Sequence, residues 1–441
     1  MANILLVYPS PEVQKQWRFG FSLNLLYLSS ILKQAGHKVI FKDYSVENLN
    51  LEALTELLSQ IEVAIIEFDS FPLKRALNIH NGEFLANFIK HTNKGIKTIA
   101  FGYDCILQPR IIPNIDYVLA QEPEKAIAYV IKCLLAKMEI NRQDLGTMKI
   151  EDLDDLPFPD RTILSSYAEH GGSIYRKSTL AKSTLVQTSR GCMNTCRFCQ
   201  RKGWTNKYNE HSIDYVISEF HDITASGYKN VWICDDNFTF NLNRAKKILK
   251  RLINDRLTEG MHIALSSWIR IDREFLELAK QANVSVISVG IESTNQEILK
   301  FYNKQINLDE TEKLIRFADQ LGVYIVGNFI IGAPMETENT INDTFEYIMR
   351  IPFDQVNVKI LDYMLGSKLY SELPDDKKNS ERHIFACKET ALNDFPMEYL
   401  KNRIHTFMKE FTASRRNHFI NKASRFGLPY KLLNGGVRPH R

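Results

Sequence analysis

Three cysteines, Cys192, Cys196 and Cys199, lie within eight consecutive residues. Cysteine thiolates are the usual ligands of iron–sulfur clusters, and a short loop allows three of them to converge on one cube of iron and sulfide. Three protein ligands leave one iron of a 4Fe–4S cluster open, and that iron can bind a chelating substrate. Arg190 and Arg201 flank the loop and would offset the negative charge of the thiolates. The spacing therefore predicts a loop that binds a 4Fe–4S cluster.

A structural zinc site is the alternative interpretation of this loop. Structural zinc is normally held by four ligands in two pairs, and no further cysteine or histidine lies close to the three in the sequence. The chain has seven cysteines, an odd number, of which three are clustered. This pattern is a poor disulfide framework and is typical of a metal or cluster site in a reducing compartment.

Composition and charge limit the other classes of function. The 441 residues are 44% hydrophobic and 24% charged, which gives enough apolar material for two or three folded domains. A net charge of +4 is too small to indicate nucleic-acid binding by itself, so nucleic acid is not an expected partner. No apolar run approaches the roughly 18 residues that span a bilayer, and the N-terminus lacks the features of a signal peptide. We therefore expect a cytoplasmic location.

The elements that must position the cysteines begin with an N-terminal region of alternating strands and helices. Between residues 1 and 135, short apolar runs alternate with segments of helical spacing. This alternation predicts an α/β fold with a doubly wound, Rossmann-like parallel sheet, which binds ligands beyond the carboxyl ends of its strands. No GxGxxG motif follows the first run, so a dinucleotide site is not indicated. We expect strands at Ile4–Tyr8, Lys38–Lys42, Val63–Phe68, Lys97–Phe101 and Tyr117–Ala120, and helices at Leu23–Gln34 and Glu122–Leu135.

The alternation returns after an acidic segment with two prolines, Asp152–Arg161, which we interpret as part of a linker. From Ser183 to Tyr363 it predicts a βα barrel, open or closed, with its chemistry at the carboxyl ends of the strands. The expected organisation is a Rossmann-like domain at 1–140, a linker at 141–178, a partial TIM-like (β/α) barrel at 179–370 and a helical C-terminal region at 371–441. Barrel strands are expected at Thr184–Thr188, Asn230–Cys234, His262–Ser266, Ser285–Ile291, Tyr324–Ile331 and Gln355–Ile360.

The cysteine loop resembles the signature of the radical S-adenosylmethionine (SAM) superfamily, CxxxCx-aromatic-C, with Phe198 as the aromatic residue. The resemblance covers about residues 178–370. It implies that the amino and carboxylate groups of SAM chelate the open iron, and that an electron from the cluster cleaves SAM to methionine and a 5′-deoxyadenosyl radical. That radical would remove a hydrogen atom from an organic or peptide substrate, and the electron would come from a donor such as flavodoxin or ferredoxin. The protein's part is to position the reactants and to exclude water and oxygen.

Four later segments agree with this resemblance, and each follows a predicted barrel strand. In chain order they are VWICDDNFT, LSSWIRID, SVGIES and NFIIGAPMET. Each segment alone also has an ordinary interpretation, such as a helix N-cap or a strand-to-helix turn. With the aromatic residue of the loop, the SAM-binding residues that the resemblance implies are Phe198, Asp235 and Asp236 (amino group), Ser267 and Arg270 (carboxylate and ribose), Glu292 (ribose hydroxyl), and Gly332 and Pro334 (adenine).

Residues 1–135 are similar to the cobalamin-binding domain that precedes the barrel in one large radical SAM subclass. The similarity rests on Leu25–Ser45, on Ile115–Ile127 and on the DDLPFPDR linker. The strand-end loops depart from the family pattern, because DSFP and FGYDC stand where small residues and a Gly-Gly-Pro turn are common. No DxHxxG motif is present, so a histidine ligand to cobalt is not indicated. The similarity implies cobalamin as a further cofactor, with contacts from Asp69, Ser70, Gly102 and Tyr103.

The combined resemblance implies a cobalamin-dependent methyltransferase that acts on carbon in a biosynthetic pathway. One alternative is a cobalamin-free radical SAM enzyme such as a peptide epimerase, in which Cys387 would donate a hydrogen atom to a substrate radical. A buried apolar cysteine is the simpler interpretation of Cys387. Another alternative is a methylthiotransferase, which carries a second cluster on three N-terminal cysteines, whereas only Cys105 and Cys133 precede the loop here. A regulator without chemistry is disfavoured by the intact cysteine triad.

Overall fold

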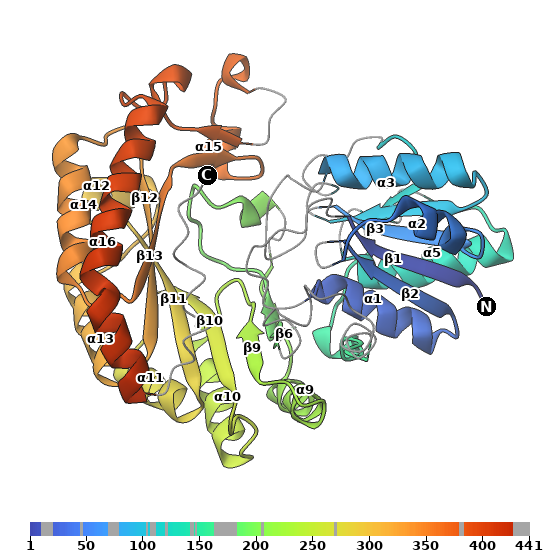
Figure 1. Cartoon of the computed structure of the whole chain (residues 1–441), viewed down its shortest axis with the longest axis horizontal. Coiled ribbons are helices and arrows are strands. Elements are labelled where there is room, and N and C mark those ends of the chain that lie inside the picture. The colour runs from blue at the N-terminus through green and yellow to red at the C-terminus, as the bar shows by residue number, and fades with distance from the viewer. Residues whose placement is uncertain are drawn as a thin grey trace. The chain divides into compact units, whose positions relative to one another are not determined.

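The computed structural model describes the chain in two compact units, Met1–Leu185 and Val186–Arg441 (Figure 1). No helix in the described part of the chain is long and apolar enough to cross a membrane. The described residues are 1–9, 21–44, 47–68, 79–102, 105, 112–119, 122–141, 145, 148–162, 183–203, 207–268, 271–378 and 383–426.

The first unit is a parallel sheet with helices on both faces. Its elements are β1 (Asn3–Tyr8), α1 (Leu23–Gln34), β2 (Lys38–Asp43), α2 (Leu51–Leu58), β3 (Val63–Glu67), α3 (Ile79–Thr92), β4 (Lys97–Phe101), β5 (Tyr117–Leu119) and α5 (Pro123–Ala136). The strand order is β2-β1-β3-β4-β5, and α1 packs against α5 while α2 packs against α3 (Figure 1). In this doubly wound order the ligand crevice forms beyond the carboxyl ends of β1 and β3, where the strand order reverses. The predicted Rossmann-like sheet is thereby confirmed.

The central strands of this sheet are apolar along almost their whole length. β1 reads NILLVY and β3 reads VAIIE, and every residue of β3 is buried. A near-continuous apolar strand is expected where helices cover both faces of a parallel sheet. Phe68, the residue after β3, is also fully buried and packs in the same core as α3. A Cβ atom at Gly82 of α3 would lie only 2.6 Å from the Phe68 ring, so this glycine makes room for it.

The second unit is built on an open barrel of six strands in the order β13-β12-β11-β10-β9-β6, of which β6 spans the boundary between the two units in the sequence. Its strands are β6 (Ser183–Val186), β9 (Asn230–Ile233), β10 (His262–Trp268), β11 (Val284–Glu292), β12 (Tyr324–Ile331) and β13 (Gln355–Ile360). Its helices are α9 (Ile213–Ala225), α10 (Leu242–Asn254), α11 (Arg273–Gln281), α12 (Gln296–Phe301), α13 (Leu308–Gln320) and α14 (Glu338–Arg350). Neighbouring strands from β9 to β13 run parallel, as the predicted partial barrel requires.

The two faces of this sheet differ in character. On β11, Ile287, Val289 and Ile291 are buried and alternate with the half-buried Ser288 and Gly290. Side chains alternate between faces along a strand, so the first set faces the helices that cover the outside of the barrel (Figure 1). The second set lines the inner face of the sheet, which we call the lumen face. The strands thus present a dry face to the helices and a more polar face to the lumen.

The C-terminal region combines a small hairpin with a long helix. β14 (Asp362–Met364) pairs antiparallel with β15 (His383–Phe385), and α16 (Met397–Phe426) follows. The hairpin is an addition to the helical tail that the sequence predicts. Along α16, the ring of Phe407 stacks on Phe345 of α14 at a centroid distance of 4.0 Å. The guanidinium of Arg415 donates to the carbonyl oxygen of Ile351 at 2.6 Å, just beyond the end of α14.

A buried ionic network holds the far end of α16 to the barrel. The ammonium of Lys422 lies 2.7 Å from the carboxylate of Asp354 and 3.0 Å from that of Asp319. His418 lies 3.4 Å from both carboxylates. Asp354 also accepts the backbone N–H of Ile325 at the start of β12. Hydrogen bonds to Asp319 and Asp354 raise the pKa of His418 to about 9.

This network makes the docking of α16 dependent on pH. The pKa of His418 rises on folding from its ordinary value of 6.5, so its stabilising effect is complete below pH 6.5 and is lost as the pH rises through about 9. We expect the amides of α16 to exchange hydrogen faster at pH 9.5 than at pH 6.5, after correction for intrinsic exchange rates. His418→Gln should remove most of this difference, which corresponds to about 2 kcal/mol. His405→Gln, at an exposed position of the same helix, should behave as the wild type; an unchanged pH response in His418→Gln would contradict the account.

Candidate functional site

The three cysteines lie in an irregular loop that follows β7 (Ser189–Arg190). All three are free and half-buried. Gly191 opens the loop with a φ of 88°, a left-handed conformation that suits glycine. Its N–H donates to the carboxylate of Asp236 at 3.0 Å, and the N–H of Cys199 donates to the carbonyl of Cys196 at 3.1 Å. The loop thus begins at a contact with the segment that follows β9.

Segments distant in the sequence hold the middle of this loop. The N–H of Arg197 donates to the carbonyl of Tyr302 at 3.0 Å, and its own carbonyl accepts the N–H of Leu369 at 3.0 Å. Its guanidinium donates to the carbonyl of Phe301 and pairs with Glu372. Next to it, the ring of Phe198 packs edge-on against Tyr302 at a centroid distance of 5.2 Å. The predicted SAM contact Phe198 therefore belongs to the wall that supports the loop.

The electrostatic environment of the three cysteines favours the binding of a cation. Burial raises the pKa of Cys192, and it raises the pKa of Cys196 to about 12. Each thiol is further disfavoured as a thiolate by its cysteine neighbours, whereas Lys304 favours the thiolate of Cys196. Thiolates are the form that binds iron, and metal binding releases their protons. Three half-buried thiols in one short loop therefore suit a site whose iron supplies the missing positive charge.

Asp235 and Asp236, which the resemblance assigns to SAM, lie at the end of β9 but face different partners. Asp235 is fully buried and accepts hydrogen bonds from the backbone and hydroxyl of Thr188 at 2.6 Å and from the hydroxyl of Ser189 at 2.7 Å. Asp236 contacts Arg201 as well as the N–H of Gly191. Asp236 thus contacts residues at both ends of the cysteine loop, and Asp235 holds the segment that precedes it.

Arg244 completes the support of this segment from α10. Its guanidinium donates to the carbonyl of Thr188 at 3.0 Å and to that of His211 at 2.6 Å, and it is itself buried. A buried guanidinium with several carbonyl partners fixes the backbone in one geometry. Sequence reasoning did not select Arg244, because an arginine on an amphipathic helix usually lies in solvent.

Glu292 ends β11 beside the cysteine loop. Its backbone has a φ of 72°, and strained backbone of this kind is concentrated at functional sites. Its carboxylate accepts the ammonium of Lys304 at 2.7 Å, and both side chains are about nine-tenths buried. A Cβ at Gly290 would lie 2.4 Å from the Glu292 carboxylate and 2.8 Å from the Lys304 ammonium. Gly290 therefore makes space for a buried ion pair that influences Cys196.

The remaining residues that the resemblance assigns to SAM occupy separate strand ends. Ser267 on β10 is buried and shares a hydrogen bond of 2.5 Å with Thr239. Gly332 follows β12 with a φ of 97°, and its N–H donates to the buried carboxylate of Glu336 at 3.0 Å. Pro334 is exposed in the same turn. Arg270 lies outside the described residues.

Cys387 lies in the segment that follows β15. Cys387 is 2% exposed, and its thiol lies 3.7 Å from the hydroxyl of Thr390. The preceding residue, Ala386, donates its N–H to the carbonyl of Leu361 just after β13, and its carbonyl lies 3.4 Å from a Cβ built on Gly332. The hairpin thus brings Cys387 near the carboxyl ends of β12 and β13.

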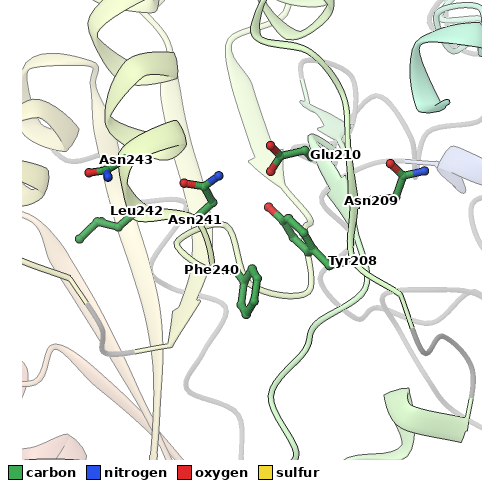
Figure 2. Close-up of a pocket in the computed structure, with 7 residues that line it drawn as sticks. All are labelled: Tyr208, Asn209, Glu210, Phe240, Asn241, Leu242 and Asn243. Atoms are coloured by element: carbon green, nitrogen blue, oxygen red, sulfur yellow. The ribbon is translucent and has the colours of Figure 1, made fainter.

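A pocket of about 580 Å³ opens beside the end of β9 (Figure 2). Figure 2 shows the rings of Tyr208 and Phe240 next to each other, with Glu210 and Asn241 above them. The two ring centroids are 4.6 Å apart. The other lining residues are Asn209, Leu242 and Asn243. Tyr208, which follows the cysteine loop, is therefore part of a mixed polar and aromatic wall.

The lumen face carries an ordered row of polar side chains that sequence reasoning missed. The amide of Asn328 on β12 donates to the hydroxyl of Ser288 at 2.9 Å and to the carbonyl of Val289 at 3.0 Å. The amide of Asn357 on β13 donates to the carbonyl oxygen of the Asn328 amide at 3.0 Å. The sequence does contain the two asparagines, but they can be recognised as neighbours only when the pairing of β12 with β13 is known.

Comparison with known proteins places these features in a family. Residues 186–348 match the family model of the radical SAM superfamily. An uncharacterized methyltransferase of Pyrococcus horikoshii is 24% identical over 395 residues, which are 83% of this chain and 82% of that protein.

Two solved structures share the fold across both units. The radical SAM methyltransferase TsrM of Kitasatospora setae, solved with tryptophan and a SAM analogue, has a TM-score of 0.69 at 15% identity, covering 86% of this chain and 76% of that chain. The cobalamin-dependent radical SAM enzyme OxsB, solved with aqua-cobalamin and SAM, has a TM-score of 0.63 at 18% identity, covering 86% of this chain and 56% of that chain.

The family match covers the cysteine loop and the barrel strands from β9 to β12. It agrees with the three free cysteines of this loop. A 4Fe–4S cluster and SAM are the cofactors of this family. Residues 186–348, the part of the chain that carries the cysteine loop, therefore form a radical SAM domain.

Proposed function

We propose that the chain is a cobalamin-dependent radical SAM methyltransferase that acts on a carbon atom of its substrate. The observation that carries the proposal is the strand order β2-β1-β3-β4-β5 in the unit that precedes the cysteine loop. This order leaves a ligand crevice beyond β1 and β3. TsrM and OxsB, which share the fold, were solved with cobalamin bound, and this likeness supports the same role for the first unit here.

The described residues around the crevice are compatible with a large planar ligand. The Phe68 ring at the end of β3 turns into the core against Gly82. The residues after β3 that depart from the family pattern, 69–72, lie outside the described residues. Gly102 has a φ of 127°, and a Cβ there would lie 1.8 Å from the Phe68 carbonyl oxygen. Only glycine permits this close approach of the two strand ends. The other predicted cobalamin contacts, Asp69, Ser70 and Tyr103, lie outside the described residues.

When bound, the cluster supplies the electron that cleaves SAM, and cobalamin supplies the methyl group. The chain's own residues fix the geometry of the cluster loop through Asp236, Arg197 and Arg244. The Glu292–Lys304 pair places a fixed dipole beside Cys196, where the charged amino acid part of SAM would bind. Preorganised charges of this kind stabilise a charged ligand without reorganisation at the moment of reaction.

The two alternatives receive less support from the structure. The thiol of Cys387 is buried and close to Thr390, which agrees with a packing role, although its position near Gly332 keeps the epimerase hypothesis testable. Cys105 and Cys133 are 1% and 2% exposed in the core of the first unit. Two buried core thiols are unsuited to a second cluster of the methylthiotransferase kind.

We expect each of Cys192→Ala, Cys196→Ala and Cys199→Ala to abolish formation of 5′-deoxyadenosine. Removing one of three thiolates takes away a ligand that the cluster needs. The measurement is iron content and 5′-deoxyadenosine after anaerobic reconstitution with SAM and dithionite. Cys234→Ala, a buried cysteine one residue before Asp235, serves as the control and should retain the cluster. A triad variant that still makes 5′-deoxyadenosine at the wild-type rate would refute the cluster assignment.

We expect the wild-type chain, purified anaerobically with cobalamin, to retain it with the characteristic corrin absorbance. Gly102→Val should lose most of the cobalamin, because its side chain would collide with the Phe68 carbonyl at the crevice. The matched control is Gly36→Val, whose φ of 80° is also positive but whose Cβ would meet nothing within 4 Å. Both variants should keep the iron content of the wild type. Absence of cobalamin from the wild type would overturn the methyltransferase proposal.

We expect Lys304→Met to weaken SAM binding by at least tenfold while the cluster still assembles. The substitution leaves the buried Glu292 carboxylate without its partner, which costs about 3 kcal/mol locally. The measurement is the SAM concentration that half-saturates the change in the electron paramagnetic resonance spectrum of the reduced cluster. Lys300→Met, on the exposed side of α12, is the control. Wild-type affinity for SAM in Lys304→Met would exclude a role of the pair in the SAM site.

A further inference from the structure

Lys359 lies on the lumen face of β13, close to the carboxyl end of the strand. Asn357 faces the lumen, because its amide bonds the lumen residue Asn328. Lys359 is two positions further along the same strand and therefore points to the same face. It pairs in register with Ile330 and precedes Ile360, the last residue of β13. Its ammonium thus belongs to the end of the barrel at which the cysteine loop lies.

The charge of Lys359 has no counterpart on this face. Lys359 is exposed, and it makes no hydrogen bond or ion pair with any residue in the described part of the chain. Within the described ranges, strands β9–β13 place one carboxylate on the lumen face, that of Glu292. Its charge is already neutralised by the ammonium of Lys304, which lies 2.7 Å away. The lumen face formed by these strands therefore carries one uncompensated positive charge.

The surroundings of Lys359 are built to hold a polar group and not only to expose a lysine to solvent. Asn328 uses its amide N–H groups on Ser288 and Val289 and its carbonyl oxygen on Asn357. Asn357 donates one N–H to this row and retains the second N–H of its amide, two positions before Lys359 on the same strand. An ammonium and an amide N–H on the same face of one strand provide two donors for an anionic group.

We propose that Lys359, assisted by Asn357, binds an anionic group of the substrate, a carboxylate or a phosphate, and so selects anionic substrates. The proposal rests on the proposed function, because it places the substrate in the lumen beside the cluster site. A charge-assisted hydrogen bond to Lys359 would orient the substrate from the edge strand, opposite the cysteine loop. This interaction would restrict the substrates to anionic molecules, a class that the family match does not specify.

The test is isothermal titration calorimetry of the cluster-loaded, SAM-bound chain with three probes: N-acetylalanine, its neutral amide and inorganic phosphate. We expect the wild type to bind at least one anion and to bind the amide at least tenfold more weakly than the acid. Tighter binding of the acid than of phosphate indicates a carboxylate substrate, and the reverse order indicates a phosphate. Lys359→Met should weaken anion binding about tenfold, Lys359→Arg should restore it to within threefold, and Lys401→Met, on the exposed face of α16, should match the wild type.

Two outcomes would overturn the proposal. One is a wild type that binds no anion or binds the amide as tightly as the acid, a result that does not depend on how any variant folds. The other is a Lys359→Met variant, with wild-type iron content and melting temperature, that binds anions like the wild type. Cobalamin uptake and 5′-deoxyadenosine formation are measured separately on the wild type, so failure of the methyltransferase proposal is distinguishable from failure of the anion site.

Discussion

The placement of three half-buried cysteines in one short loop is the constraint on which the second unit depends. Burial raises the pKa of Cys196 to about 12, and the neighbouring cysteines also oppose its ionisation. Such a loop is stable in one shape only if other elements hold it. Asp236 fixes its beginning, and the carbonyls of Tyr302 and Phe301 fix its middle through Arg197. The residues at the carboxyl ends of the barrel strands thus form a rigid frame around a site that favours a bound cation.

Many polar side chains around the loop form hydrogen bonds or ion pairs within this frame and are not exposed to solvent. Asp235 and Arg244 are buried and together hold Thr188, the residue just before β7. The Glu292–Lys304 pair is buried on the other side of the loop. Buried charges of this kind persist only where each has a partner, since an isolated one is costly. Their concentration around one loop is what an electrostatically preorganised site requires.

The sequence predicted the architecture well because its signals are local. The apolar run of β3 and the helical spacing of α1 each identify an element, and alternation of the two types implies parallel sheets. The cysteine triad was predictable for the same reason. The roles of Arg244, Lys304 and the asparagines of the lumen could not be read in this way, because each depends on contacts between segments far apart in the chain. The β14–β15 hairpin was missed because strands of three residues carry too little pattern.

The central claim joins two cofactors in one chain, and a single sample can test it. Wild-type protein is purified anaerobically in the presence of cobalamin, reconstituted with iron and sulfide, and reduced with dithionite in the presence of SAM. We predict that one preparation contains both corrin absorbance and about four irons per chain, and that it produces 5′-deoxyadenosine. A preparation that makes 5′-deoxyadenosine but binds no cobalamin would contradict the methyltransferase assignment, and one that makes none would contradict the radical mechanism itself.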